Sequence, residues 1–267
     1  ANNRISRISA ERLSSLVALE TLDLSNNNIM EVRAGAFPPL PLKNLELSRN
    51  RVRRIEGLTF HGLHGLLSLK IQRNSITRLM DGAFWGLNNM EVLQLEYNNL
   101  TEVSKGWLYG LLTLQQLHLS HNAISRIKPD AWEFCQKLAE LDLSWNQLSR
   151  LEEGSFVGLS VLEQLHVGNN RISFIADGAF RGLSNLQALD VREFVTTEEE
   201  EQGVVLVSGF VLQADFQRNV LSIRVLWVWI LTVWFLAFSR DLKYNEISWT
   251  IEDMNGPFSA LDNLRKL

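Results

Sequence analysis

The stretch LAELDLSWNQL, from Leu138 to Leu148, decides the fold of this chain because the same arrangement of residues returns along the sequence. Leu19–Ile29 reads LETLDLSNNNI, Met90–Leu100 reads MEVLQLEYNNL and Leu114–Ile124 reads LQQLHLSHNAI. These segments share the pattern L-x-x-L-x-L-x-x-N-x-L, with methionine in the first place in one of them and isoleucine in the last place in two. A pattern that recurs at a fixed period of about 20 to 50 residues indicates a stack of repeats.

The asparagine of the pattern measures the period. It occurs at Asn3, Asn27, Asn50, Asn74, Asn98, Asn122, Asn146, Asn170 and Asn245. Successive positions are 23 or 24 residues apart as far as Asn170, and the last interval is 75 residues. This is the leucine-rich-repeat signature, which predicts an α/β solenoid, curved, with parallel strands on its concave face.

Each recurring position of the pattern has a physical role in such a solenoid. The L-x-L core predicts a short strand with its leucines directed inward and the intervening residue directed to solvent. Asparagine carries two donors and an acceptor, so a buried row of asparagines can satisfy the backbone where each strand turns away. A large apolar residue follows ten residues after most of them and is expected to fill the space behind the sheet. These residues are Phe37, Phe60, Phe84, Leu108, Trp132, Phe156 and Phe180.

The long last interval predicts an interruption. Joining Asp190 directly to Leu242 gives LQALDLKYNEI, an intact motif. The predicted organisation is therefore a leucine-rich-repeat array over residues 1–190, a non-repeat insert over 191–241 and a continuation of the array over 242–267. The insert holds VLWVWILTVWFLAF, whose 14 residues fall short of the roughly 20 that a transmembrane helix needs. A membrane segment and a non-native product such as a retained intron are both open, and we favour the second.

Composition limits the function. With 46% apolar and 21% charged residues the chain is globular, and its net charge of −4 favours no binding to nucleic acid. The only cysteine, Cys135, excludes an internal disulfide and predicts a buried apolar filler. The sequence contains no signal peptide, although the expected location is extracellular.

The sequence predicts neither an enzyme nor a cofactor. It has no phosphate-binding loop, no G-x-S-x-G and no H-E-x-x-H motif. His118 and His121, with His166 two repeats on, could suggest a metal. A concave sheet spreads such side chains apart, whereas zinc requires three or four converging ligands, so we expect no metal and no small-molecule substrate.

Several phrases resemble the LRIG family, the leucine-rich-repeats-and-immunoglobulin-like-domains proteins. They are DGAFWGL (81–87), NNLTEV (98–103), KGWLYGL (105–111), PDAWEFCQKL (129–138) and NEISWTIEDMNG (245–256). The resemblance implies a fragment of the leucine-rich-repeat ectodomain of a single-pass cell-surface protein. It further implies that the parent protein regulates growth-factor receptor signalling and is attached to the membrane through parts outside this sequence.

The concave face is the expected binding surface of a solenoid. Its outward positions include His118, Asp142 and His166 in the strands, and Tyr97, His121 and Trp145 three residues after them. Because strands lie about 4.8 Å apart, Tyr97, His121 and Trp145 are predicted to form one stripe. Exposed aromatic residues are enriched at protein interfaces, so these residues are our candidate binding site. The alternative is that Tyr97 and Trp145 only shield the edge of the asparagine turn.

Two functions follow from these patterns. The first is an extracellular protein-recognition module that regulates growth-factor receptors. The second is a leucine-rich-repeat scaffold of the matrix or the cell interior without that role. The sequon Asn99-Leu100-Thr101 distinguishes the compartments, because Asn99 occupies a slot that faces solvent and is predicted to carry a glycan in the secretory pathway.

Overall fold

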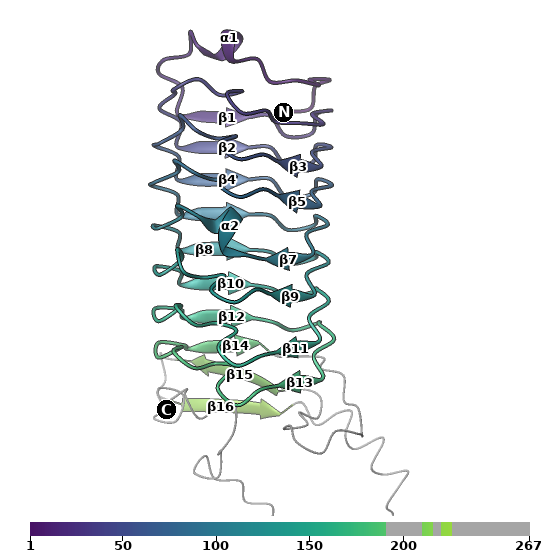
Figure 1. Cartoon of the computed structure of the whole chain (residues 1–267), viewed down its shortest axis with the longest axis vertical. Coiled ribbons are helices and arrows are strands. Elements are labelled where there is room, and N and C mark those ends of the chain that lie inside the picture. The colour runs from purple at the N-terminus through teal and green to yellow at the C-terminus, as the bar shows by residue number, and fades with distance from the viewer. Residues whose placement is uncertain (191–209, 216–219, 226–267) are drawn as a thin grey trace, which may run out of the picture.

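The computed structural model describes residues 1–190, 210–215 and 220–225, and it has the form of a solenoid whose turns are stacked along one axis (Figure 1). One strand from each turn joins a single sheet in the order β1-β2-β4-β6-β8-β10-β12-β14-β15-β16. Its strands are β1 (Thr21–Asp23), β2 (Asn44–Glu46), β4 (Ser68–Lys70), β6 (Val92–Gln94), β8 (Gln116–His118), β10 (Glu140–Asp142), β12 (Gln164–His166), β14 (Ala188–Asp190), β15 (Phe210–Asp215) and β16 (Val220–Val225). The predicted leucine-rich-repeat solenoid is confirmed.

The sheet is parallel from β1 to β14, and its register follows the motif. Leu141 at the centre of β10 lies opposite Leu117 in β8 and Leu165 in β12. All three leucines are fully buried, while the residues on either side of Leu141 are only half-buried. The alternation of the L-x-L core therefore places one face of the sheet against the core and the other toward solvent.

A second set of short strands lies on one flank of the solenoid, beside the main sheet (Figure 1). These strands pair in parallel as β3 (Arg54–Ile55) with β5 (Arg78–Leu79), β7 (Glu102–Val103) with β9 (Arg126–Ile127), and β11 (Arg150–Leu151) with β13 (Phe174–Ile175). Helix is limited to α1 (Ala10–Leu13) and α2 (Lys105–Leu108) in the described residues. The rest of each turn returns to the sheet through tight bends.

The core behind the sheet is filled by the predicted apolar residues. Phe37, Phe60 and Phe84 stack on one another with ring centroids 5.9 Å apart, and Phe156 stacks on Phe180 at the same spacing. Trp132 is buried between these two groups and donates its indole N–H to the Ser155 carbonyl at 2.8 Å. Successive turns thus share one continuous apolar interior, as a repeat that cannot bury its own face requires.

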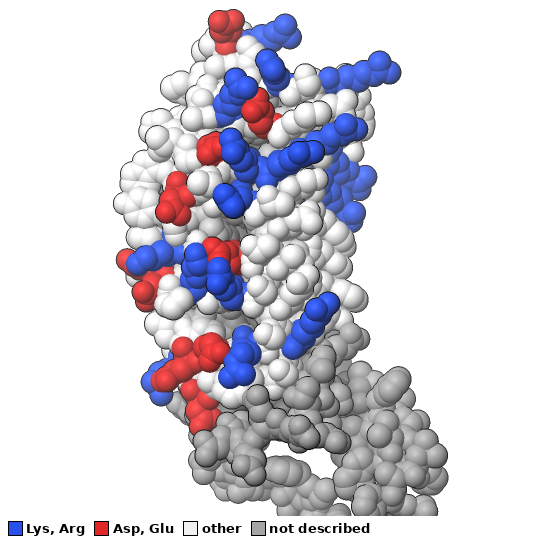
Figure 2. Space-filling view, turned by 45° about the vertical axis from the view of Figure 1, so that its right-hand side comes forward, with Lys and Arg blue, Asp and Glu red and all other residues white. Residues whose placement is uncertain are grey.

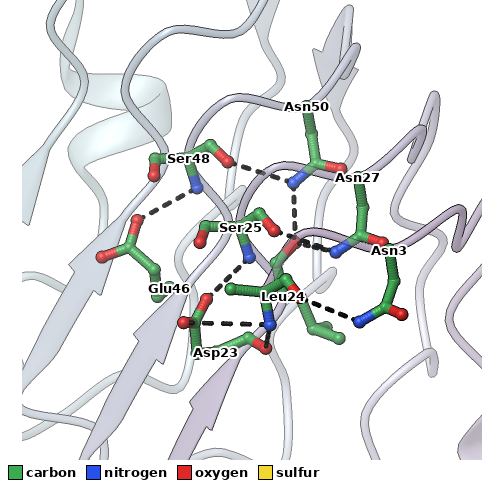
Figure 3. Close-up of polar contacts among 9 residues, drawn as sticks. Asn3, Asp23, Leu24, Ser25, Asn27, Glu46, Ser48 and Asn50 are labelled. Carbon is green, nitrogen blue, oxygen red and sulfur yellow. Dashed lines mark hydrogen bonds and ion pairs between the residues drawn. The ribbon is translucent and has the colours of Figure 1, made fainter.

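The motif asparagines form a ladder that joins each turn to its neighbours. Asn50 donates through Nδ2 to the carbonyls of Ser48 in its own turn and of Leu24 in the preceding turn (Figure 3). It also donates to the Leu47 carbonyl at 3.0 Å. Its Oδ1 accepts the backbone N–H of Ile29 at 3.1 Å. The same bonds repeat at Asn74, Asn98, Asn122, Asn146 and Asn170. From Asn27 to Asn170, each motif asparagine therefore satisfies an amide that belongs to the previous repeat.

The hydrogen bonds at the two ends of the asparagine ladder differ from those in its middle. Asn3 is exposed and bonds to the Ala1 carbonyl instead of occupying a buried rung, because no preceding turn in the structure covers it. At the other limit the buried Ile172 amide has no acceptor among the described residues. By the repeat interval, that acceptor would come from the next motif asparagine, which is Asn245 in the sequence.

The main sheet changes direction where the array was predicted to be interrupted. β15 pairs with β14 antiparallel, and β16 pairs with β15 antiparallel, in contrast to every earlier pair of the sheet. Both strands belong to the segment 191–241 that the sequence marks as an insert. The rest of that segment and the predicted continuation over 242–267 lie outside the described residues, so the division into three parts stays a prediction. No helix in the described part of the chain is long and apolar enough to span a membrane.

Candidate functional site

The turn that follows each sheet strand from β1 to β12 holds one residue in the left-handed conformation. The residues are Asn26, Arg49, Arg73, Tyr97, His121, Trp145 and Asn169, with φ between 52° and 56°. The conformation is the same in every turn, so the side chains at this position leave the backbone in parallel directions, one strand spacing apart. The geometry thus places side chains from successive repeats in a column along the axis.

Three aromatic rings fill the middle of this column, and we call Tyr97, His121 and Trp145 the aromatic column. The centroids of the Tyr97 and His121 rings are 4.2 Å apart at an interplanar angle of 9°. The His121 and Trp145 rings are 5.2 Å apart at 12°. The guanidinium of Arg73 lies over the other face of Tyr97, 4.0 Å from its centroid. The stripe predicted from the sequence is present as a continuous stack that begins with a cation–π contact.

Two residues of the aromatic column are exposed, His121 between them is half-buried, and all three have a backbone conformation that costs free energy. Tyr97 is 41% exposed and Trp145 is 53% exposed. Bulky residues are genuine outliers in the left-handed region, which asparagine tolerates far better, and such positions cost on the order of 1–3 kcal/mol. Two other turns of the series use asparagine at the same place, Asn26 and Asn169, and two use arginine, Arg49 and Arg73. The turn itself therefore does not require an aromatic residue at this position.

Beside the column, the outward face of the sheet is acidic in the second half of the array. From β6 to β14 the charged outward residues are Glu96, Glu140, Asp142 and Asp190, and none is lysine or arginine. The two strand histidines face this acidic surface: His118 Nδ1 lies 3.9 Å from Glu140 Oε1, and His166 Nδ1 lies 4.0 Å from Asp190 Oδ2. The surface therefore favours a cationic ligand over an anionic one.

The protonation of this face follows from its contacts. The neighbouring Asp190 carboxylate raises the pKa of His166, an effect that the Asp142 and Glu140 charges strengthen and burial opposes. Burial raises the pKa of Glu96, whose Oε2 is buried without a hydrogen-bond partner. Asp142 is held in place because its Oδ1 accepts both the backbone N–H of Ser144, at 2.9 Å, and the Ser144 hydroxyl, at 2.6 Å.

The other residues singled out in the sequence occupy the expected places. Cys135 is fully buried, and burial raises the pKa of its thiol to about 12. The side chain of Asn99 is exposed between buried Asn98 and Leu100, while its backbone N–H donates to the Ile76 carbonyl at 2.8 Å. No group of three metal-binding side chains converges within the residues that the structure describes.

Another set of exposed aromatic residues did not emerge from the sequence pattern. Trp85 stacks on Tyr109 with centroids 4.8 Å apart, and Tyr109 meets the edge of Phe134 at 4.7 Å. Trp85 and Tyr109 directly follow the buried residues Phe84 and Leu108, so they lie behind the sheet and away from the aromatic column. The sequence signal that could have indicated these residues is a large aromatic residue directly after a position predicted to be buried.

Family models support the assignment of the fold. The model described as "Leucine rich repeat" matches residues 41–100, 88–148 and 136–193, and a second of the same description matches 18–40. The chain belongs to the leucine-rich-repeat family. Arrays of this family are typical of binding modules, since stacked repeats provide an extended surface and no enclosed reaction centre.

Among curated proteins, this leucine-rich-repeat chain is similar to LRIG proteins, which confirms the resemblance seen in its motifs. It is 49% identical over 67 residues to human leucine-rich repeats and immunoglobulin-like domains protein 3, and 43% identical over 66 residues to human protein 2. Each match covers 25% of this chain and 6% of the relative, so the chain spans only a small part of those proteins. Human podocan-like protein 1 is 44% identical over 61 residues, covering 23% of this chain and 12% of that protein.

Solved leucine-rich-repeat structures align over most of the described array. A chain in the crystal structure of a TLR13–ssRNA13 complex is 34% identical with a TM-score of 0.67, covering 71% of this chain and 28% of that one. A chain in the Drosophila Toll–Spatzle complex is 26% identical with a TM-score of 0.61, covering 73% and 28%. The first of these complexes contains RNA, so the expectation that this chain binds no nucleic acid, which rested on net charge, is not supported.

Proposed function

We propose that this chain is an extracellular protein-recognition module and that it binds its partner through the aromatic column and the acidic sheet face beside it. The observation that carries the proposal is the aromatic column itself, three stacked rings on a left-handed backbone, of which Tyr97 and Trp145 are exposed. Large aromatic side chains with few torsions dominate the energy of protein interfaces. The candidate site comprises Tyr97, His118, His121, Asp142, Trp145 and His166.

The chemistry of this surface indicates which residue types its partner presents. Stacked π systems attract cations, and Asp142 with Glu140 adds negative charge along the same strands. The ring faces of His121 are covered by Tyr97 and Trp145, so a partner meets ring edges and the outer face of Trp145. A segment carrying arginine or lysine beside apolar residues fits such a surface.

The similarity to LRIG proteins supports a role in regulating growth-factor receptors at the cell surface, with membrane attachment through other parts of the natural protein. The match to podocan-like protein 1 at nearly equal identity supports the alternative of a leucine-rich-repeat scaffold without a receptor-regulating role. The two proposals differ in whether receptor ectodomains bind the chain.

The test is direct binding of purified receptor tyrosine kinase ectodomains to the full chain, measured by biolayer interferometry. Trp145→Asn is the decisive variant, because asparagine is better suited than tryptophan to the left-handed turn and should leave the fold intact. We expect it to weaken binding by about 30-fold or more, as loss of a hot-spot residue does. Trp85→Asn, which removes a comparably exposed tryptophan behind the sheet, should leave the affinity unchanged.

Each other result contradicts a stated part of the proposal. Unchanged affinity in Trp145→Asn would remove the aromatic column from the binding site. Equal losses in Trp145→Asn and Trp85→Asn would show that the contact is not specific to the sheet face. Failure of every receptor ectodomain to bind would favour the scaffold function.

A further inference from the structure

Charge is strongly segregated along the solenoid although its sum is small. Residues 1–80 carry twelve Lys and Arg against six Asp and Glu, a net charge of +6. Residues 81–190 carry seven against thirteen, a net charge of −6. Figure 2 shows basic side chains gathered toward the end of the molecule that holds β1, along the flank of the short strands. An inference from net charge alone therefore misses a strongly basic surface.

The centre of this surface is a group of arginines in two consecutive repeats. We call Arg49, Arg51, Arg53, Arg54 and Arg78 the arginine cluster. Four of them come from the run Arg-Asn-Arg-Val-Arg-Arg, which leads from the turn after β2 into β3, and the fifth lies in β5. All five side chains are exposed, while Asn50 and Val52 within the run are buried. The buried residues anchor the run, so the arginines are presented from a fixed backbone.

The arginine cluster is incompletely neutralised. Arg54 and Arg78 face each other in the parallel register of β3 and β5, at a spacing of about 4.8 Å between strands. Arg54 pairs with Glu56 at 2.7 Å, but Arg49, Arg51, Arg53 and Arg78 have no ion-pair partner among the described residues. Like charges side by side in a sheet are destabilising.

The same flank shows how the array neutralises arginine elsewhere. The equivalent register position in β7 and β9 pairs Glu102 with Arg126, whose side chains form an ion pair at 2.6 Å. Lys128 contributes a second contact to Glu102 at 2.6 Å. Together these cations hold the pKa of Glu102 below its ordinary value. No such carboxylate joins Arg54 to Arg78: Glu56 pairs with Arg54 alone, and Arg78 is left open to the counter-charge of a ligand.

The residue type defines the chemistry of that ligand. The guanidinium fork matches the oxygens of sulfate and phosphate with two parallel hydrogen bonds. The arginine cluster extends along an open flank, so it fits a linear polyanion that lies across the repeats. Single-stranded nucleic acid would also need aromatic platforms for its bases. Phe60, the only Phe, Tyr or Trp between Arg49 and Met80, is buried, and the aromatic column lies beside acidic residues.

We propose that the arginine cluster binds a sulfated polysaccharide of the heparan sulfate type. The polysaccharide supplies closely spaced sulfates and requires no stacking surface. Only Arg49 shares the column of left-handed turns with Tyr97, His121 and Trp145, two repeats before Tyr97. The other four arginines lie apart from the aromatic column, and the site does not depend on the proposed protein-recognition function. The chain would then carry a cationic surface for a glycan in its first repeats and an acidic surface for a protein in the later ones.

The test compares two variants of the full chain that lose the same charge. Arg51→Gln/Arg53→Gln/Arg78→Gln removes three unpaired members of the cluster. Arg126→Gln/Arg171→Gln/Arg181→Gln removes three arginines from the later repeats, and Arg126 and Arg171 occupy the same motif positions as Arg78 and Arg51. Binding to heparin is measured by surface plasmon resonance over a series of salt concentrations. Thermal unfolding followed by circular dichroism verifies that both variants are folded.

We expect the cluster variant to lose about tenfold or more in heparin affinity, with the salt slope reduced by about 2 to 3, and the matched variant to lose much less. Unsulfated heparosan should not bind the parent chain. Equal losses in the two variants, or binding of heparosan, would overturn the proposal. Tighter binding of a 20-base-pair RNA duplex than of heparin would overturn it in favour of nucleic acid. Trp145→Asn should retain heparin affinity, which separates this site from the proposed function.

Discussion

Replacing one rung of the asparagine ladder by alanine is expected to destabilise the array more than its small change in volume suggests. Asn146 is 7% exposed, and its Nδ2 donates to the carbonyls of Leu119 at 3.0 Å, Leu143 at 3.0 Å and Ser144 at 3.1 Å. Its Oδ1 accepts the Ile124 N–H at 2.9 Å. Asn146→Ala removes all four bonds from the interior of the turn.

The four backbone groups that bond to Asn146 lose unequal amounts of free energy, and the sum of these amounts gives the expected destabilisation. The Leu119 and Leu143 carbonyls keep Asn122 and Asn170 as donors, and the Ser144 carbonyl keeps the His121 N–H. The buried Ile124 amide keeps no partner and costs roughly 1–3 kcal/mol. Each bond lost to a carbonyl that keeps another donor adds about 0.5 kcal/mol or slightly more. The expected loss in the free energy of unfolding is about 3–5 kcal/mol.

Urea denaturation followed by far-UV circular dichroism measures this loss, and hydrogen exchange of the Ile124 amide locates it. Gln147→Ala, at the exposed neighbouring position, should remain within about 0.5 kcal/mol of the parent. Exchange at Ile124 should accelerate in Asn146→Ala and not in Gln147→Ala. A urea midpoint and slope equal to those of the parent in Asn146→Ala would refute the role assigned to the ladder.

Other predictions follow from single residues. Because its pKa is raised in the fold, His166 should contribute stability below its ordinary pKa of 6.5 that is lost as the pH rises through the raised value, and His166→Asn should abolish this pH dependence of the urea midpoint. Cys135 should resist iodoacetamide at pH 8 in the native chain and react in urea. In material from secreting cells, mass spectrometry should find a glycan on Asn99, and Asn99→Gln should lack that mass while folding normally. Deleting residues 191–241 should raise the urea midpoint, because the next motif asparagine then falls in register, and a lowered midpoint would contradict the predicted insert.

The regular part of the fold was predictable because its determinants are local to the motif. The spacing of Leu141 and Leu143 around Asp142 specifies a strand with one buried face, and Asn146 specifies the turn after it. Since the period is nearly constant, Tyr97, His121 and Trp145 occupy equivalent positions of successive repeats. Their alignment in one column could therefore be predicted from the residue spacing. Whether that alignment serves binding stays a prediction.

Other features depend on contacts between repeats that no single motif contains. The placement of Arg73 over Tyr97 requires the left-handed turn, whose φ cannot be deduced from an arginine in the sequence. The buried Glu96 oxygen and the contact between His166 and Asp190 depend on packing across neighbouring strands. The arginine cluster was missed because the net charge sums over the whole chain, whereas binding depends on the local field.

The ladder also determines how the array responds to mechanical load. Each asparagine bonds no further than the neighbouring turn, so a pull between the two ends acts on the contacts between turns one after another. A repeat of 24 residues that is released extends to about 80 Å. An array built this way would lengthen in steps of one repeat under tension, while the turns not yet released stay folded.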